Sequence, residues 1–579
     1  MPTPRCGRSA ADRAQPNPTD PLSTAAHTEH AFERLIVREL TTAGGWLGED
    51  ASGAPTEHRN YDAQLGLYPD DLMAFVRDTQ GHAWDKLVDL AGSEHTARVS
   101  LLRRVAAQLD RRGTIELLRG GLTEKGLPLR LAFFEPDLEI EPTARVLYES
   151  NRLRVVRQVR FDPKTGDSID LVLFVNGVPT ATAELKNRYT GQTVDDAIRQ
   201  YREDRPTSNL LLGRRAFVHF ALDADLAYMT TRLEGRDTRF LPFNQGSGGA
   251  GNPGGAGNPA SPTGGHPTEY VWQRVWERDS WMELIEKFVF VEQPSAETKR
   301  KGAQPTVIFP RFHQWDVVRE CASHARLHGS GNSYLIQHSA GSGKSKEIAW
   351  LAHDLSTLHG EDRRAVFEKV IVITDRQVLD RQLQAQVKAF EQVPGTVREI
   401  NESSKQLREA LEGEQARIVI STLQKFPFVL AQLTGAGSTL KSRTYAVIVD
   451  EAHSSQTGES ATDLKAVLGN RPADDPEDDD QDDGVPEVLR RLAARGVQPN
   501  LSFFAFTATP KPRTNEVFGT LGPDGLKRAF HTYSMRQAVE EDFIVDVPEE
   551  LPRPTRRQCA WRIAPARSSS CRRTRRRAH

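Results

Sequence analysis

The chain has 579 residues, a formal net charge of -2, 38% hydrophobic residues and 27% charged residues. This composition is typical of a soluble globular protein of roughly three or four domains. No apolar run is long enough to cross a membrane, and the amino terminus lacks the apolar core of a signal peptide. The four cysteines form no CxxC pair. They indicate neither a disulfide framework nor a zinc site, and we expect a reducing, cytoplasmic location.

The charge is unevenly distributed along the chain. Residues 551–579 contain ten Arg and no acidic residue, which leaves -12 for residues 1–550 once these ten are subtracted from the total of -2. Bulk charge therefore does not indicate a nucleic-acid-binding protein, and any such surface must be a local patch. An acidic run at 474–483 predicts a solvated surface loop.

The first half of the chain predicts helices followed by strands. A head at 1–29, rich in Pro, Ala, Ser and Thr, predicts disorder. Helical spacing follows over 31–40 and again over 70–90. Residues 145–230 read as alternating strands, with strands at 154–161, 168–175, 178–186, 215–222 and 226–231 and one helix at 193–205. The Asn176-Gly177 pair between two of these runs predicts a hairpin.

This hairpin carries residues that suit metal chemistry. Asp170 lies on its first strand, and Glu184 and Lys186 share a face at the end of the second. A plain two-residue turn would put Asp170 and Glu184 on opposite faces, so we expect a three-residue turn or a bulge that sets them opposite each other. Two carboxylates there would suit Mg²⁺, with Lys186 near the nucleophile or the developing charge. The alternative is an ordinary charged strand edge.

A Gly-, Pro- and Asn-rich stretch at 245–268 predicts a flexible linker or a long loop. Three tryptophans follow it, Trp272, Trp276 and Trp281. They could stack on bases, but buried aromatic side chains on a helix facing the next domain are the favoured interpretation.

The stretch Tyr334–Ser345 predicts a strand, a phosphate-binding loop and a helix. Gly341, Ser342 and Gly343 would let backbone N–H groups approach phosphate oxygens, with the positive end of the helix dipole beside them. Lys344 would reach the β- and γ-phosphates of ATP, and the Ser345 hydroxyl would bind Mg²⁺. His338 stands where the consensus loop begins with Gly. The alternative is a Gly-rich turn before a surface helix.

Further apolar runs end in polar residues, as the parallel strands of a nucleotide-binding α/β sheet do. Asp450, after one run, would hold Mg²⁺, and Glu451 would orient the attacking water. His453 would couple this site to Thr507 and Thr509, after the next run. Gln314, about thirty residues before the loop, could bind the adenine edge. A GSGKS, a DEAH and a TAT motif in this order are a highly specific combination.

With these motifs, the chain resembles the restriction (R) subunit of type I restriction-modification enzymes from about residue 30 to 546. The resemblance extends to stretches such as 171–177, 190–194 and 228–231. It implies an α/β protein with a PD-(D/E)xK endonuclease domain at 30–244 and a first RecA-like superfamily 2 helicase domain at 269–547. It also implies double-stranded DNA and the methylation and specificity subunits as partners, and Asp170, Glu184 and Lys186 as the nuclease site. The ATP site would comprise Gln314, Lys344, Ser345, Asp450 and Glu451.

The resemblance stops before the arginine-rich tail at 548–579, where we expect out-of-frame translation or a basic nucleic-acid arm. The family continues into a second RecA-like domain, so the chain reads as a truncated R subunit, and we expect it to hydrolyse ATP poorly and not to translocate DNA. The alternatives are a non-catalytic fragment that binds ATP, DNA or partners, and a repair helicase-nuclease outside restriction.

Overall fold

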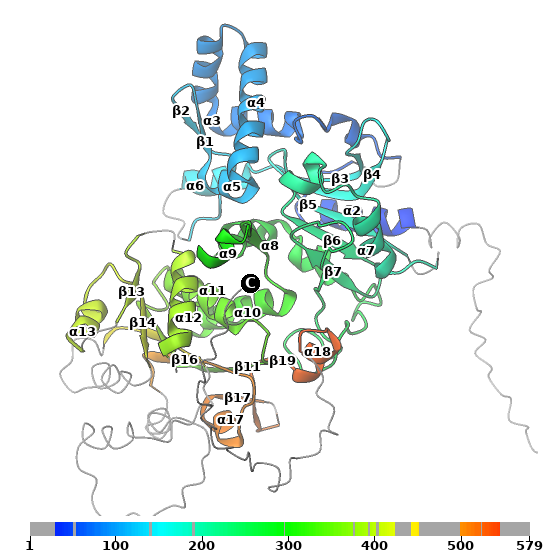
Figure 1. Ribbon diagram of the computed structural model, residues 1–579. Helices are drawn as coiled ribbons and strands as arrows, with labels where there is room; N and C mark the ends of the chain where they lie inside the picture. Colours follow the sequence, from blue (N-terminus) through cyan, green and yellow to red (C-terminus); the bar gives the residue numbers. More distant parts are fainter. Residues whose placement is uncertain are drawn as a thin grey trace, which may run out of the picture.

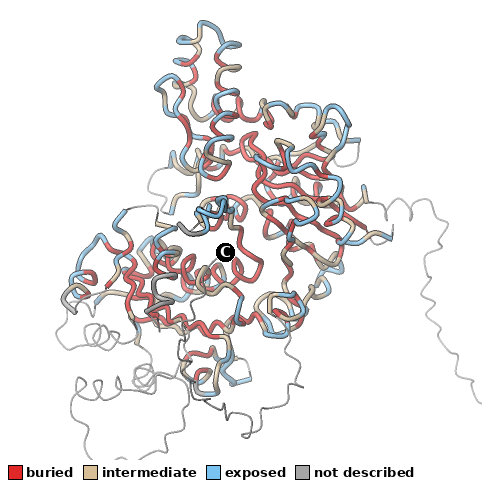
Figure 2. Tube along the Cα trace, in the orientation of Figure 1, coloured by how far each residue is buried: buried red, intermediate tan, exposed pale blue. Residues whose placement is uncertain are grey.

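Figure 1 shows the computed structural model of the chain. It describes residues 29–49, 54–137, 142–187, 191–294, 296–374, 377–391, 394–400, 404–422, 442–450, 498–522 and 524–544. The head (except Glu29), the acidic run, the arginine-rich tail, Glu451 and His453 lie outside the described residues. Two large sheets dominate the described part, and their strands are mostly buried (Figure 2). None of the helices described is both long and apolar enough to span a membrane.

The first sheet has six strands in the order β3-β4-β5-β6-β7-β8. They are β3 (Leu153–Arg160), β4 (Ser168–Val175), β5 (Val178–Leu185), β6 (Val218–Leu222), β7 (Ala227–Thr230) and β8 (Leu241–Pro242). All neighbours are antiparallel except β5 and β6, which are parallel. The crossover between that pair contains α7 (Val194–Glu203) and the π-helical turn η3 (Leu211–Arg215). The predicted strands and helix are therefore confirmed, with shifts at two ends.

Those two ends need correction. Residues expected to open the strand region belong instead to the helix α6 (Pro142–Glu149), which begins with Pro, a residue favoured in the first turn of a helix. The strand expected from Arg215 begins at Val218, because the π-helical turn extends through Arg215. Neither change moves a predicted site residue.

The hairpin between β4 and β5 contains the expected bulge. Its turn has two residues, with Val175 opposite Val178, and the pairing shifts by one residue between Leu173 and Phe174. Beyond the shift Leu171 lies opposite Ala183, so the same register places Asp170 opposite Glu184. A bulge adds one residue to one strand and so restores the common face that a two-residue turn alone would forbid.

Helices cover this first sheet and project from it (Figure 1). The predicted helices are present as α2 (Glu29–Thr42) and α3 (Pro69–Ala91). The remaining elements of this part are η1 (Glu57–Asn60), α4 (Glu94–Arg112), α5 (Thr114–Gly120), β1 (Leu122–Glu124) and β2 (Leu127–Leu129). The apolar face of α2 is buried through Phe32, Ile36 and Leu40, and Glu33 is buried among them. Burying a carboxylate on a helix costs free energy unless it is paired, so we expect Glu33 to have buried partners.

The second sheet has seven strands in the order β13-β14-β12-β15-β16-β11-β19, and every neighbouring pair is parallel. They are β11 (Ser333–His338), β12 (Lys369–Thr374), β13 (Val397–Glu399), β14 (Ile418–Thr422), β15 (Tyr445–Val449), β16 (Leu501–Thr507) and β19 (His531–Tyr533). The long helices of this part are α10 (Phe312–His328), α11 (Lys344–Thr357), α12 (Gln377–Ala389) and α13 (Ser404–Glu412). Because the strands are parallel, the residues that follow them gather at one edge.

Shorter elements complete the described part. They are η4 (Val271–Val275), α8 (Arg278–Glu283), η5 (Leu284–Phe288), β9 (Phe290–Glu292), α9 (Ala296–Arg300), β10 (Thr306–Ile308), α17 (Pro512–Phe518), β17 (Thr520–Leu521), β18 (Lys527–Arg528) and α18 (Met535–Glu540). Trp272, Trp276 and Trp281 are each at most 1% exposed. The three side chains are therefore core residues, as favoured from the sequence, and cannot stack on bases from these positions.

The segment predicted as a linker or loop is a long loop with defined contacts to the second sheet. Gly251 accepts a hydrogen bond from the backbone N–H of Thr532 in β19, and Gly254 accepts one from the hydroxyl of Ser534. The carboxylate of Glu540 in α18 accepts one from the N–H of Ala256. The loop thus connects the two sheets by hydrogen bonds as well as by covalent continuity.

Candidate active sites

The first candidate site lies where β4 and β5 meet. Asp170 Oδ2 accepts a hydrogen bond of 2.8 Å from the backbone N–H of Leu185, across the hairpin. Glu184 is fully buried on the neighbouring strand, and its Oε1 lies 2.6 Å from Nε of Arg205. Lys186 is buried directly after β5, and its Nζ lies 2.5 Å from Oε1 of Glu29. The hairpin therefore gathers the three predicted nuclease residues.

Several carboxylates lie close together in this buried cluster, and this shifts the pKa values of its members. Burial raises the pKa of Glu184 well above its usual value, the charge of Asp170 raises it further, and Arg205 opposes both. Burial would lower the pKa of Lys186, but the negative charges of Asp170, Glu29 and Glu184 outweigh it, so its pKa is raised. Lys186 is thus held as an ammonium beside the carboxylates.

The donor set fits a divalent cation. Oε2 of Glu184 is buried and has no hydrogen-bond partner among the described residues, whereas Oε1 is held by Arg205. Oxygen atoms of two carboxylates are ligands that Mg²⁺ accepts, and a buried oxygen without a donor is costly until something positive satisfies it. The residues that would hold the ion are Asp170 and Glu184.

Sequence reasoning missed two members of this cluster. Glu33, on α2, is buried, and its Oε1 lies 3.0 Å from Nε of Arg157. Gln158, in β3, donates from Nε2 to Glu33 Oε2 and to Asp170 Oδ1, both at 3.0 Å. Burial raises the pKa of Glu33, and the charge of Asp170 adds to that rise. The only sequence signal for Glu33 was an acidic residue on the apolar face of a predicted helix.

The second candidate site is the loop between β11 and α11. Gly341 and Gly343 have φ angles of +76° and +92°, which residues with a Cβ rarely adopt. Lys344 and Ser345 follow in the first turn of α11. At its φ of +92° any other residue would be strained, and a Cβ on Gly343 would lie 2.3 Å from Nε2 of Gln314. The loop therefore has the backbone conformation expected of a phosphate-binding loop, and its residues fit a nucleoside triphosphate.

The other predicted nucleotide residues lie at the same edge of the sheet. Asp450 directly follows β15, and Thr507 is the last residue of β16. β16 pairs with both β15 and β11, so the ends of the three strands are neighbours. Thr509 is exposed just beyond β16. The parallel sheet thus brings Asp450, Thr507 and the loop to one edge, as the strand pattern predicted.

A network of buried polar side chains supports the loop from α10. Ser342 presents its carbonyl oxygen to Arg311 Nη2 and, at 2.8 Å, to Gln314 Nε2. Gln314 Oε1 in turn accepts from the backbone N–H of Arg311 at 2.9 Å. The Arg311 guanidinium lies over the ring of Phe543, 3.8 Å from its centroid. Both ends of the Gln314 amide, the predicted adenine-binding group, are therefore occupied by the protein itself.

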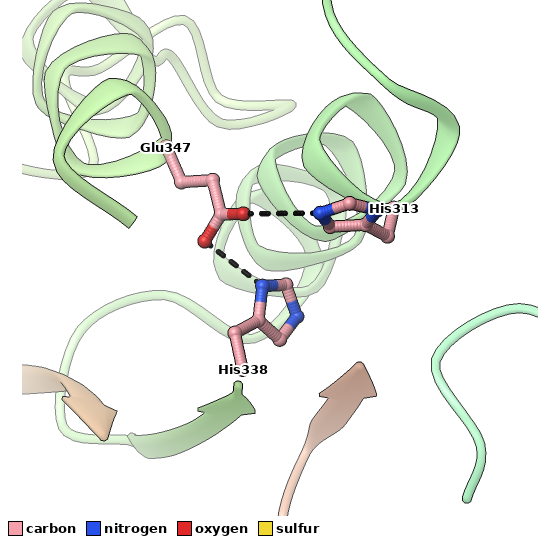
Figure 3. Close-up of side chains that lie close together, drawn as sticks. All are labelled: His313, His338 and Glu347. Atoms are coloured by element: carbon pink, nitrogen blue, oxygen red, sulfur yellow. Dashed lines mark hydrogen bonds and ion pairs between the residues drawn. The ribbon is translucent and has the colours of Figure 1, made fainter. Parts of the chain in front are cut away.

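His338, which replaces the consensus Gly, belongs to a second buried network beside the loop (Figure 3). Its Nδ1 lies 2.8 Å from Oε2 of Glu347 in α11, whose Oε1 lies 3.6 Å from Nε2 of His313. Its Nε2 lies 2.8 Å from Nδ1 of His531 in β19, and His531 Nε2 lies 3.1 Å from Oδ2 of Asp316. Burial lowers the pKa of both His313 and His338. Through this network His338 connects β11 to α10, α11 and β19.

Comparison with protein families matches two regions of the chain. Residues 140–240 match the model described as type I restriction enzyme R protein N terminus, and residues 313–476 match the SWI2/SNF2 ATPase model. These matches coincide with the six-stranded sheet and with part of the seven-stranded sheet. The chain is therefore an α/β protein that combines an R-protein amino-terminal region with a helicase-like ATPase region.

The chain is also similar to individual known proteins. The type I restriction enzyme SsaAORF53P endonuclease subunit of Staphylococcus saprophyticus is 22% identical over 392 residues, which cover 68% of this chain and 35% of that protein. The SauCOLORF180P endonuclease subunit of Staphylococcus aureus is 24% identical, over 37% of this chain and 19% of that protein. Among solved structures, the SWI2/SNF2 ATPase core of Sulfolobus solfataricus in complex with dsDNA has 14% identity and a TM-score of 0.22, covering 35% of this chain and 32% of that chain.

The resemblance predicted from the sequence is confirmed: the chain is similar to the R subunits of type I restriction enzymes. The matched stretch spans about a third of the first of these curated relatives and about a fifth of the second.

Proposed function

We propose that the six-stranded sheet carries a PD-(D/E)xK endonuclease site and that the seven-stranded sheet carries the ATP site of a DNA translocase. The observation that supports the nuclease best is the bulged hairpin. It sets Asp170 opposite Glu184, beside the buried Lys186, and Oε2 of Glu184 has no hydrogen-bond partner among the described residues. A solvated strand edge, the alternative interpretation, would not bury a carboxylate and an ammonium together.

In this proposal each side chain has one role. Asp170 and Glu184 bind Mg²⁺, which supplies a polarised water and neutralises charge on the phosphodiester. Arg205 holds Oε1 of Glu184, so that Oε2 would be available to bind the ion. The Lys186 ammonium lies beside the two carboxylates and stabilises the negative charge that develops on the scissile phosphate. It must first leave Glu29, which now accepts its hydrogen bond.

At the second site we assign each residue a role in binding or hydrolysing ATP. Backbone N–H groups of the loop and the Lys344 ammonium bind the phosphates, and the Ser345 hydroxyl and Asp450 hold Mg²⁺. Glu451 orients the attacking water, and His453 connects the site to Thr507 and Thr509. We further propose double-stranded DNA as the substrate and the methylation and specificity subunits as partners, by analogy with the related restriction enzymes.

The test of the nuclease site uses Lys186, because one substitution removes its charge and another keeps the charge in a different geometry. An R protein of the full length of the curated relatives, containing this chain, would be assembled with methylation and specificity subunits and given DNA, ATP and Mg²⁺. We expect Lys186→Ala to abolish cleavage and Lys186→Arg, which keeps the charge, to retain a fraction of it. Wild-type cleavage by Lys186→Ala would contradict the proposal.

A further inference from the structure

Gln158 has a backbone conformation that is rare for a residue with a side chain. Its φ angle is +50°, in the left-handed region, although it lies inside the strand β3. On either side of it, Arg157 pairs with Leu171 and Val159 pairs with Ile169, so the register places Gln158 opposite Asp170. Such strain persists only where the surroundings fix it, and it is concentrated at functional sites.

The side chain of Gln158 uses both of its N–H donors and its carbonyl oxygen at this point. Its two N–H groups serve one carboxylate each, Glu33 Oε2 and Asp170 Oδ1, and its Oε1 accepts from the hydroxyl of Ser168 at 2.9 Å. The opposite amide orientation would aim Oε1 at two carboxylate oxygens, so the contacts determine which way the amide points. Gln158 is therefore a neutral bridge between two negative groups.

This bridge fixes Asp170 from one side, and the backbone fixes it from the other. Oδ1 is held by Gln158, and Oδ2 is held by the N–H of Leu185 at 2.8 Å. A carboxylate has about four lone-pair sites, so each oxygen retains one for a cation. The orientation of Asp170 is thus set before any ion binds, which lowers the cost of building the site.

We propose that Gln158 is a positioning residue of the nuclease site, whose side-chain amide orients Asp170 for a divalent cation and separates it from Glu33. This rests on the proposed nuclease function and adds to it a residue that does not itself touch the ion. The strained backbone is maintained because it brings the amide to both carboxylates. A residue that only filled the strand would need neither the positive φ nor the contacts with both carboxylates.

Two substitutions separate the amide from the backbone. Gln158→Ala removes the side chain and keeps the unfavourable φ, whereas Gln158→Gly removes the side chain and adopts that φ freely. Mn²⁺ binding to the full chain would be measured by calorimetry, with Asp170→Ala defining the part that depends on the nuclease site. Gln64→Ala, which changes an exposed glutamine, is the matched control. Thermal unfolding of each protein would be followed alongside.

We expect both Gln158 variants to weaken Asp170-dependent Mn²⁺ binding about tenfold to hundredfold, as removal of groups that orient metal ligands does. Gln158→Gly should unfold at a higher temperature than Gln158→Ala and still bind Mn²⁺ poorly. Wild-type affinity in both variants would overturn the proposal. Recovery of affinity in Gln158→Gly alone would also overturn it, because the role would then belong to the backbone. If the wild type shows no Asp170-dependent binding, the nuclease site itself is wrong, and the role of Gln158 fails with it.

Discussion

Gln314 donates a hydrogen bond of 2.8 Å from its side-chain amide to the backbone carbonyl of Ser342, inside the phosphate loop. The sequence predicted that this amide binds adenine. In the structure it supports the loop, and its Oε1 is also occupied, by the N–H of Arg311. The two roles are compatible only if ATP binding releases the amide from Ser342.

This arrangement leads to a prediction about base selectivity. If Gln314 binds adenine, Gln314→Ala should weaken binding of ATP by about 1–2 kcal/mol and leave binding of GTP unchanged, since GTP presents a different base edge. Calorimetry with both nucleotides and Mg²⁺ makes the comparison. An equal loss for ATP and GTP would show that the amide acts only by supporting the loop.

Lys344 and Lys346 offer a matched pair for the phosphate loop. Both are half-buried lysines in the first turn of α11, but Lys346 lies near Glu292, at 3.8 Å. We expect Lys344→Ala to remove binding of ATP–Mg²⁺ and Lys346→Ala to leave it nearly unchanged. The reason is that only Lys344 occupies the position that reaches the β- and γ-phosphates. Equal affinity in the wild type and Lys344→Ala would rule out this loop as the nucleotide site.

The buried ion pair between Arg205 and Glu184 predicts a large effect on stability. Removing one partner of such a pair leaves a buried charge uncompensated, which costs about 3–5 kcal/mol. Arg205→Ala should therefore lower the free energy of unfolding by that amount in denaturant titrations. Arg145→Ala, which removes exposed ion pairs with Glu135 and Glu149, is the control and should cost about 1 kcal/mol or less. Similar losses in the two variants would contradict the importance assigned to the buried pair.

Glu286 predicts a pH dependence of stability. Burial raises its pKa from 4.5 to about 7, so folding disfavours the ionised form. The cost is therefore full above pH 7 and declines as the pH is lowered from 7 towards 4.5. Glu286→Gln should raise the free energy of unfolding by about 1–3 kcal/mol at pH 8 and by much less near pH 5. Thermal unfolding at both pH values checks this, with the exposed Glu361→Gln as control. A gain that is equal at the two pH values would show that ionisation of the buried carboxyl is not its cause.

The polar residues at the ends of strands could be predicted from the sequence, because each directly follows a recognisable apolar run. Asp170 and Glu184 could be identified as a facing pair, since strand geometry allows only a bulge or a longer turn to bring them together, and the bulge is present. The parallel order that brings Asp450 to the phosphate loop was likewise expected from the motifs.

Residues recruited from distant segments could not be predicted in this way. Glu33 reaches the nuclease cluster across more than a hundred residues, and its place on the apolar face of a helix indicates burial but not which residues it contacts. The strained φ of Gln158 has no sequence signal, because glutamine is not a residue that favours it. The interaction of Gln314 with the loop also depends on tertiary packing, which brings α10 against the turn after β11.

The most direct test of the central claim is the effect of Asp170→Ala on two activities of one complex. An R protein of the full length of the curated relatives, containing this chain and carrying this substitution, would be assembled with methylation and specificity subunits, and DNA cleavage and DNA-dependent ATP hydrolysis would be measured in the same reactions. The nuclease cluster and the phosphate loop lie on different sheets, so we predict that cleavage is abolished while ATP hydrolysis stays within about twofold of the wild type. Normal cleavage by the Asp170→Ala complex would contradict the assignment of the nuclease site.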